Sequence, residues 1–226
     1  INNRTKMIII NTPHNPSGTV FSKEDMLQLE ILTKDSNIIV LSDEVYEHMI
    51  YDGEEHQSAC LFPDLKSKSF ITGSFGKTFH NTGWRIGYCC APKALMNEFM
   101  KVHQFNVFCI HHPTQKGIAD YMQEPSHYLG LSSFFQKKRD LFLDLIKDSR
   151  FTFTPSKGTY FQVLNYSEIT QEYDVDYAKR LTIESGIASI PLSVFNIDNL
   201  DNKVLRFCFA KEDETLKRAA TILRNK

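Results

Sequence analysis

The first 124 residues alternate short apolar runs with helical patterns. Strands are predicted at four such runs, Lys6–Asn11, Ile38–Ser42, Ser69–Thr72 and Ile86–Cys90. Helices are predicted at Pro92–His103 and Pro113–Met122. Because unbroken apolar strands separated by helices are typical of a parallel sheet covered on both faces, we expect an α/β fold with a mainly parallel sheet.

A further helix is predicted directly after Ser22–Asp25, since a serine followed by an acidic residue three positions later is a helix-start signature. Its apolar face is expected to consist of Met26, Leu27, Leu29, Ile31 and Leu32.

Beyond residue 125 the pattern changes to that of a smaller α+β domain. A long helix is predicted from Pro125 to about Asp148, with Lys137–Asp140 as a solvated charged face. Strands are predicted at Phe151–Phe153, Tyr160–Leu164 and Val204–Phe209, and helices at Tyr173–Ser185 and Glu212–Arg224. We therefore divide the chain into residues 1–125, part of a larger domain, and residues 126–226, a linking helix and a small domain.

Composition and charge exclude some classes of function. The chain has 226 residues and a formal net charge of -1, so no basic surface suggests a nucleic-acid partner. No run approaches the roughly 18 apolar residues of a membrane span. Five cysteines without a C-x-x-C pair predict reduced core thiols in a cytoplasmic protein and no metal site. The start "INNRTKMIII", without an initiator Met, suggests a cut inside a larger protein.

Polar residues follow the predicted strands, at the edge where ligands bind in open α/β sheets. Asn11–Gly18 follows the first strand, and its other interpretation is a simple turn before the capped helix. Asp43 follows the second strand, where a buried carboxylate needs a positive partner such as a protonated ring nitrogen. The alternative for Asp43 is a helix cap.

The third strand leads into "GSFGKT" and then "TGWR". The hydroxyl of Ser74 and the guanidinium of Arg85 suit a phosphate group. Lys77 is no Walker lysine, because the G-x-x-x-x-G-K-[ST] pattern is absent. A lysine beside a phosphate site and opposite an acid instead suits a Schiff base. Together with the amide, acid and phenol at neighbouring strand ends, these residues predict pyridoxal phosphate as the cofactor.

Four motifs carry a family resemblance: "NTPHNPSG", "SDEVYEHMIYDG", "GSFGKTFHNTGWRIGY" and "LRFCFAK". They resemble the class I and II (fold-type I) aminotransferases, which depend on pyridoxal phosphate. Within that family the chain is most similar to the kynurenine, glutamine and methionine transaminase branch, on the side of the bacterial methionine aminotransferases. "KVHQF", "EPSHYLGL" and "IPLSVF" extend the likeness over essentially the whole chain, as the C-terminal part of the family's length.

The resemblance implies a role for each cofactor residue. Lys77 would form the Schiff base and carry the proton between the substrate Cα and the cofactor. Asp43 would pair with the pyridinium nitrogen, and Asn15 and Tyr46 would hydrogen-bond the ring's phenolic oxygen. The phosphate ligands would be Ser74 and Arg85. Residues 1–125 would then be the remainder of the cofactor-binding large domain.

For the substrate, the resemblance implies that Arg206 clamps the α-carboxylate, with help from Asn15. Phe195 and Tyr160 are candidates for the side-chain pocket or for the core. The expected reaction is amino group transfer between an L-amino acid of the Met, aromatic, Gln or kynurenine type and a 2-oxo acid.

The family normally has a front segment that supplies a Gly-rich phosphate loop and an aromatic that stacks on the ring, and this chain lacks it. We therefore expect the chain alone to bind the cofactor weakly or not at all and to be inactive, while the longer protein works as a cytoplasmic homodimer. Two alternatives stay open: a C–S β-lyase of the same fold, and an aminotransferase-like ligand-sensing domain of a regulator.

Overall fold

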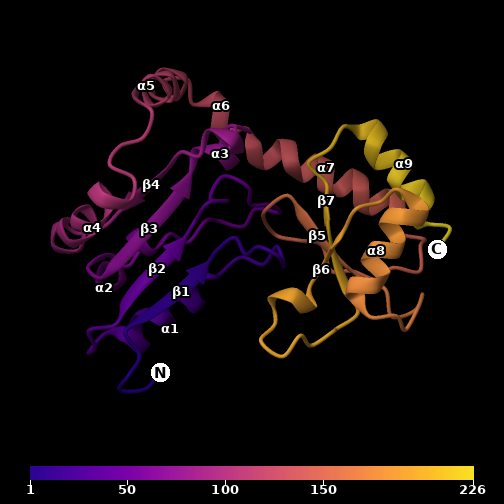
Figure 1. Ribbon diagram of the computed structural model, residues 1–226, viewed down its shortest axis with the longest axis horizontal. Coiled ribbons are helices and arrows are strands. Elements are labelled where there is room, and N and C mark those ends of the chain that lie inside the picture. The colour runs from indigo at the N-terminus through magenta and orange to yellow at the C-terminus, as the bar shows by residue number, and fades with distance from the viewer. The chain divides into compact units, whose positions relative to one another are not determined.

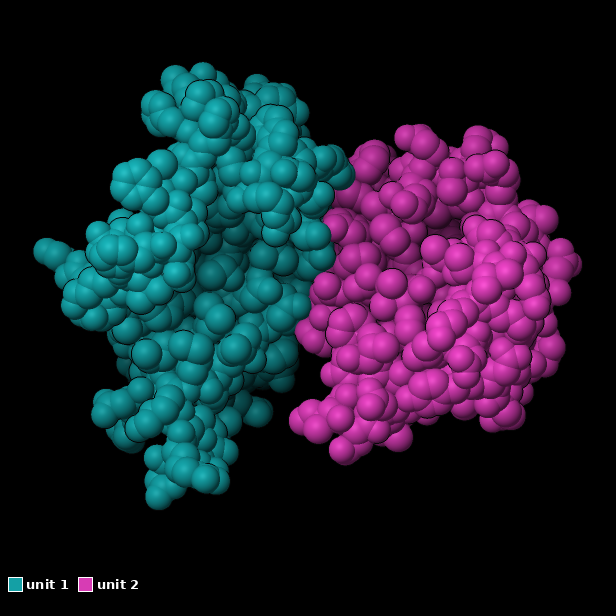
Figure 2. Space-filling model, in the orientation of Figure 1, with its two compact units in different colours: residues 1–13, 20–131 teal, residues 14–19, 132–226 magenta.

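The computed structural model describes residues 1–226. It divides into two compact units (Figures 1 and 2). Unit 1 comprises Ile1–Pro13 and Val20–Leu131, and unit 2 comprises His14–Thr19 and Ser132–Lys226. The short segment His14–Thr19 thus contributes to unit 2 although the chain on both sides of it belongs to unit 1. The functional roles of the two predicted domains stay predictions.

Unit 1 is built on a four-stranded sheet (Figure 1). Its strands lie in the order β1 (Met7–Asn11), β2 (Ile39–Asp43), β3 (Ser69–Ser74) and β4 (Gly87–Cys90). The β1/β2 and β2/β3 pairs are parallel, whereas β4 runs antiparallel to β3. This confirms the predicted α/β fold with a mainly parallel sheet.

The direction of β4 has a local cause. Between β3 and β4 the chain forms only the one-turn helix α3 (Phe75–Thr78) and the 3-10 turn η2 (Thr82–Trp84). A parallel connection needs a crossover that spans the sheet, usually with a long helix. The short connection instead returns the chain at the same edge, so β4 must run backwards along β3.

The remaining elements of unit 1 are mostly helical. They are α1 (Lys23–Thr33), η1 (Ala59–Leu61), α2 (Pro63–Lys66), α4 (Lys93–Asn106), α5 (His112–Tyr121) and α6 (Ser126–Leu129). Ser22 caps α1 by accepting from the Asp25 N–H at 3.1 Å, and the Asp25 carboxylate accepts from the Ser22 N–H at 2.8 Å. The capping box predicted at this helix is confirmed.

One hydrophobic core cluster of unit 1 lies between the sheet and the helices α1, η1 and α2. Its buried members are Ile10, Met26, Val40, Ala59, Phe62 and Leu65. Of the apolar face predicted for α1, only Met26 is buried, and Leu29 packs at the edge of this core. Ile31 and Leu32 are 72% and 64% exposed, so that part of the prediction was wrong. The sheet contacts only one narrow strip of the helix, and these two side chains lie outside it.

Unit 2 contains a three-stranded antiparallel sheet in the order β5 (Phe161–Asn165), β7 (Val204–Cys208) and β6 (Ile190–Pro191). Its helical elements are α7 (Leu131–Ile146), α8 (Asp174–Ser185), η3 (Ser193–Phe195) and α9 (Asp213–Leu223). The predicted α+β character is confirmed. The strand expected at Phe151–Phe153 is reduced to a single bridge between Thr152 and Asn165.

The predicted long helix over Pro125–Asp148 is two helices, α6 and α7, separated by Gly130. Glycine has the greatest backbone freedom and a low helix propensity, which favours a break at this position. The predicted solvated face also needs correction. Arg139 is only 3% exposed, and its Nη1 donates to the Ser156 carbonyl at 2.6 Å. The Ser156 carbonyl, in the 155–158 turn, needs a hydrogen-bond donor because it is buried, and Arg139 supplies that donor from a buried position.

The five cysteines are free thiols, and none of them is buried. The expectation of core thiols was therefore wrong. Cys89 and Cys90 lie on β4, the last strand of the sheet, where little of the chain covers them. None of the helices combines the length and the apolar character that a bilayer span requires.

Candidate functional site

Five of the predicted site residues lie at the carboxyl edge of the unit 1 sheet. Asp43 ends β2, Ser74 ends β3, and Lys77 lies in α3 directly beyond it. Because β2 and β3 are parallel neighbours, with Asp43 opposite Thr72, their ends meet at the same edge. The Lys77 Nζ lies 6.0 Å from the centre of the Tyr46 ring. The fifth residue, Arg85, follows η2.

Asp43 is a half-buried carboxylate without a cationic side chain beside it. Its carboxylate accepts from the Val45 N–H at 3.4 Å and from the Thr72 hydroxyl. Burial raises the pKa of Asp43 above its ordinary value, and the nearby Glu44 charge adds to this rise. A protonated group bound at this edge would supply the missing positive partner.

Glu44, the next residue, was not singled out from the sequence. It is 2% exposed, and its Oε1 accepts from the Ser42 hydroxyl at 2.7 Å and the Ala59 N–H at 3.0 Å. Its Oε2 lies 2.7 Å from the His56 Nε2. Burial alone would raise the pKa of Glu44, but these partners, His56 first, hold it below its ordinary value. The network ties both ends of the 44–59 segment, which carries Tyr46, to the sheet.

The turn between Ser74 and Arg85 is tightly closed. A Cβ added at Gly76 would lie 3.0 Å from the Thr82 Cα and 3.4 Å from the Ser74 Oγ. The exposed Arg85 is held in the left-handed conformation at φ 57°, and its Nη1 donates to the Thr82 carbonyl at 3.1 Å. A hydroxyl and a guanidinium on one close turn form a donor set that fits a phosphate.

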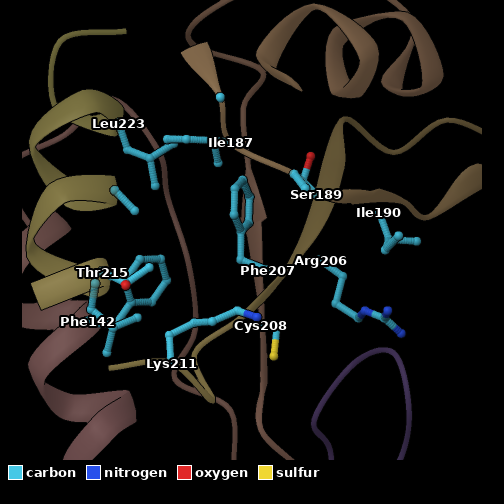
Figure 3. A pocket seen from close by; sticks show the side chains of 14 residues that line it. Phe142, Ile187, Ser189, Ile190, Arg206, Phe207, Cys208, Lys211, Thr215 and Leu223 are labelled. Carbon is cyan, nitrogen blue, oxygen red and sulfur yellow. The ribbon is translucent and has the colours of Figure 1, made fainter. Parts of the chain in front are cut away.

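The other two predicted residues, Asn15 and Arg206, lie in unit 2. Arg206 projects from β7, and its Nη1 donates to the Asn15 Oδ1 at 2.5 Å. Its guanidinium also lies 4.0 Å from the centre of the Phe161 ring, within the range of a cation–π interaction. Arg206 also lines an apolar cavity between β7 and α9, and Figure 3 shows its guanidinium directed away from the α9 side of that cavity.

The 14–19 loop is fixed to unit 2 by its glycine. The Gly18 carbonyl accepts from the Lys157 and Gly158 N–H groups, both at 2.9 Å. Gly18 has φ 73°, and a Cβ there would lie 2.5 Å from the Ser156 Cβ, so only glycine fits. Since Arg139 binds the carbonyl of Ser156, this buried arginine supports the turn on which the loop carrying Asn15 rests.

The two candidate pocket residues differ in their surroundings. Tyr160 packs among aromatic rings of unit 2, 5.7 Å from Phe135 and 4.6 Å from Phe161 between ring centres. Phe195 is 54% exposed at the end of η3. The fully buried Asp174 holds this turn, because it accepts from both the N–H and the hydroxyl of Ser193 at 2.7 Å. Asp174 was not expected from the sequence, where it is one of several acidic residues.

Known proteins similar to this chain are aminotransferases. The chain is 43% identical over 225 residues to the methionine aminotransferase of Escherichia coli (strain K12), covering 99% of the chain and 58% of that protein. It is 34% identical to the kynurenine–oxoglutarate transaminase of Dictyostelium discoideum over 240 aligned residues, covering 96% of the chain and 55% of that protein.

Solved structures of proteins described as aminotransferases also superpose on this chain. A crystal structure of an Escherichia coli protein described as having a methionine aminotransferase function superposes with a TM-score of 0.97 at 42% identity, over 100% of this chain and 60% of that one. For the N-succinyldiaminopimelate aminotransferase of Mycobacterium tuberculosis the TM-score is 0.94 at 29% identity, over 100% of this chain and 59% of that one.

The chain spans little more than half the length of these curated relatives. Residues 1–223 match the family described as aminotransferase class I and II, which confirms the resemblance predicted from the motifs. The chain therefore belongs to the class I and II aminotransferase family.

Proposed function

We propose that this chain carries the catalytic lysine and the substrate clamp of an enzyme that transfers an amino group between an L-amino acid and a 2-oxo acid. The observation that supports this most is the Asp43 carboxylate, which has no cationic side chain beside it and ends the strand next to the one that leads to Lys77. A general hydrogen-bonding site would not require a half-buried acid without a cationic partner.

The residues of unit 1 fit pyridoxal phosphate. The Asp43 carboxylate would hold a proton on the ring nitrogen, and Tyr46 would donate to the ring's oxygen. The Ser74 hydroxyl and the Arg85 guanidinium would bind the phosphate. When bound, this cofactor supplies an electron sink for the charge that develops at the substrate Cα. The Lys77 amine would move the proton at that carbon.

Unit 2 would bind the substrate. Arg206 presents a planar guanidinium whose Nη1 already donates to Asn15. A second pair of N–H donors on the same group can bind an α-carboxylate in a bidentate pair. Asn15 would keep the guanidinium oriented and contribute its amide to the cofactor or the substrate.

The names of the relatives support methionine and kynurenine among the amino donors, with the aromatic amino acids and glutamine as further candidates. The same relatives favour transfer over the β-lyase and regulator alternatives, since each is named as an aminotransferase. On the family resemblance alone, we also propose a cytoplasmic homodimer, with unit 1 as the cofactor-binding domain.

The test asks whether pyridoxal phosphate becomes attached to Lys77. The chain, and a longer protein containing it, are incubated with pyridoxal phosphate, reduced with borohydride and digested, and the modified peptide is identified by mass spectrometry. In the longer protein we expect the label on Lys77, its loss in Lys77→Ala, and production of the keto acid from methionine. The chain alone should show little label and no keto acid. Lys68→Ala is the control and should keep the label, because the Lys68 ammonium donates to carbonyls at and just after the end of α1. A label on other lysines alone would contradict the proposal.

A further inference from the structure

Tyr88 lies directly across the strand end that leads to the candidate site. It pairs with Gly73 in the antiparallel β3/β4 ladder. A Cβ added at Gly73 would overlap the ring of Tyr88, so the ring lies over the Gly73 backbone and the position tolerates no side chain. The ring also packs on Phe75, with 5.3 Å between the ring centres. Tyr88 therefore contacts residues on both sides of Ser74.

Beyond Gly73, the Tyr88 hydroxyl donates to the Glu47 carboxylate, 41 residues away along the chain. Glu47 lies next to Tyr46, in the turn where the Glu47 N–H donates to the Glu44 carbonyl at 2.9 Å. Burial and this hydrogen bond raise the pKa of Tyr88, so the hydroxyl keeps its proton and stays a donor. Hydrogen bonds to a charged acceptor are about twice as strong as neutral ones.

The Glu47–Tyr88 contact therefore links two segments of the site. One is the 44–59 segment, which carries Tyr46, and the other carries Ser74 at the end of β3 and Lys77 just beyond it. The Lys77 Nζ lies 6.0 Å from the centre of the Tyr46 ring. The Tyr88 ring lies over Gly73 of β3, and its hydroxyl donates to Glu47 beside Tyr46, so Tyr88 joins the two segments that carry these side chains.

We propose that Tyr88, acting through Glu47 across Gly73, is a positioning residue that sets where Tyr46 lies relative to Lys77. This inference rests on the proposed function, because the separation matters for a group that touches both side chains. Tyr88 itself touches neither the cofactor nor the substrate in this proposal.

The experiment compares Tyr88→Phe and Glu47→Ala with the conservative Glu47→Gln, which keeps an acceptor for the hydroxyl. Tyr166→Phe is the matched control, because it removes the hydroxyl of a fully buried tyrosine in unit 2 that donates to the Glu172 carbonyl at 3.0 Å. Amide hydrogen exchange of residues 44–49 and 73–78 is measured without cofactor. Pyridoxal phosphate affinity, and the pH midpoint of the bound cofactor's visible absorbance, are measured with the cofactor in a longer protein that contains this chain.

Tyr88→Phe and Glu47→Ala should speed exchange in both segments about tenfold, weaken cofactor binding by a similar factor and shift the pH midpoint. Glu47→Gln should keep exchange, affinity and midpoint close to those of the unmodified protein. Tyr166→Phe should leave all three unchanged. Unchanged exchange in either segment, or an unshifted midpoint at normal affinity, would overturn the proposal. If a longer protein that contains this chain takes up no pyridoxal phosphate, the proposed function fails, and the exchange data still decide whether Tyr88 links the two segments.

Discussion

At the scale of single residues, Asp43 and Glu44 are adjacent carboxylates whose pKa values shift in opposite directions. Glu44 has three hydrogen-bond donors, including His56, and Asp43 has no cation to offset its burial. Neighbouring acids with diverging environments are typical of sites where one acid is structural and the other serves a ligand. In the proposed function, Glu44 is the structural acid and Asp43 is the acid that meets the cofactor.

Asp43→Asn is expected to stabilise the chain without cofactor at neutral pH, by about 0.5–1 kcal/mol. The folded-state pKa of Asp43 is raised, so the ionised carboxylate costs stability above that pKa, and the amide removes this cost. The gain should vanish in acid, where both states are protonated. Chemical denaturation at two pH values measures it, with the exposed Asp35→Asn as the control. A loss of stability at neutral pH would contradict the assignment.

At the scale of elements, short segments are positioned by single buried polar groups. Gly18 attaches the 14–19 loop to the 155–158 turn, and Asp174 attaches the start of α8 to η3. A buried polar group is costly unless it is hydrogen-bonded. Each such group therefore holds together the particular segments that supply its hydrogen-bond partners. The positions of Asn15 and Phe195 follow from these attachments.

Asp174→Ala is expected to lower the free energy of unfolding by about 2–4 kcal/mol, because it leaves the buried N–H and hydroxyl of Ser193 without their acceptor. Asp176→Ala on the same helix is the control, since that carboxylate is 70% exposed and lies 4.0 Å from the Lys179 Nζ. Urea denaturation of both variants makes the comparison. Equal effects would show that the Asp174 contact does not stabilise η3.

At the scale of the whole molecule, the buried Glu44 network makes stability depend on acid. The folded-state pKa of Glu44 is lowered, so its contribution is complete above the unfolded-state value of about 4.3 and is lost as the pH falls through the folded-state pKa.

Glu44→Gln is therefore expected to flatten the loss of stability below about pH 4.3 and to lower stability at pH 7 by about 3 kcal/mol, since it breaks a buried charge network. Thermal unfolding across a pH series measures both effects. Glu55→Gln, an exposed residue between Glu44 and Ala59 in sequence, should leave the pH profile unchanged. If Glu44→Gln lost stability in acid as steeply as the unmodified chain does, the Glu44 network would not be the source of the pH dependence.

Much of the architecture could be predicted from the chain. The strands β1, β2 and β3 are short β-branched runs, and the Ser22 cap is a local signature of three-residue spacing, so both follow from neighbouring residues. The predicted site residues were found because their types occur together at strand ends and match a family. Their individual roles stay predictions, to be tested through Lys77.

Other features could not be predicted, because they depend on residues far apart in sequence. Arg139 stands in a charge run that suits a solvated helix face, yet it is buried by the carbonyl of Ser156. Tyr88 stands in an ordinary strand, and nothing near it in sequence indicates Glu47 as its partner. The cysteines stand in apolar runs, which suggested burial. Whether a strand such as β4 lies at the edge of the sheet cannot be read from those runs.

The sequence by itself determined the alternation of strands and helices, the capped start of α1 and the set of chemically apt residues, because spacing along the chain encodes local backbone geometry. Only the tertiary structure decided that the 14–19 loop joins unit 2, and that Asp43 stays without a cation while Glu44 accepts three hydrogen bonds. Those outcomes depend on which distant groups packing brings within hydrogen-bonding distance, and local spacing carries no information about that.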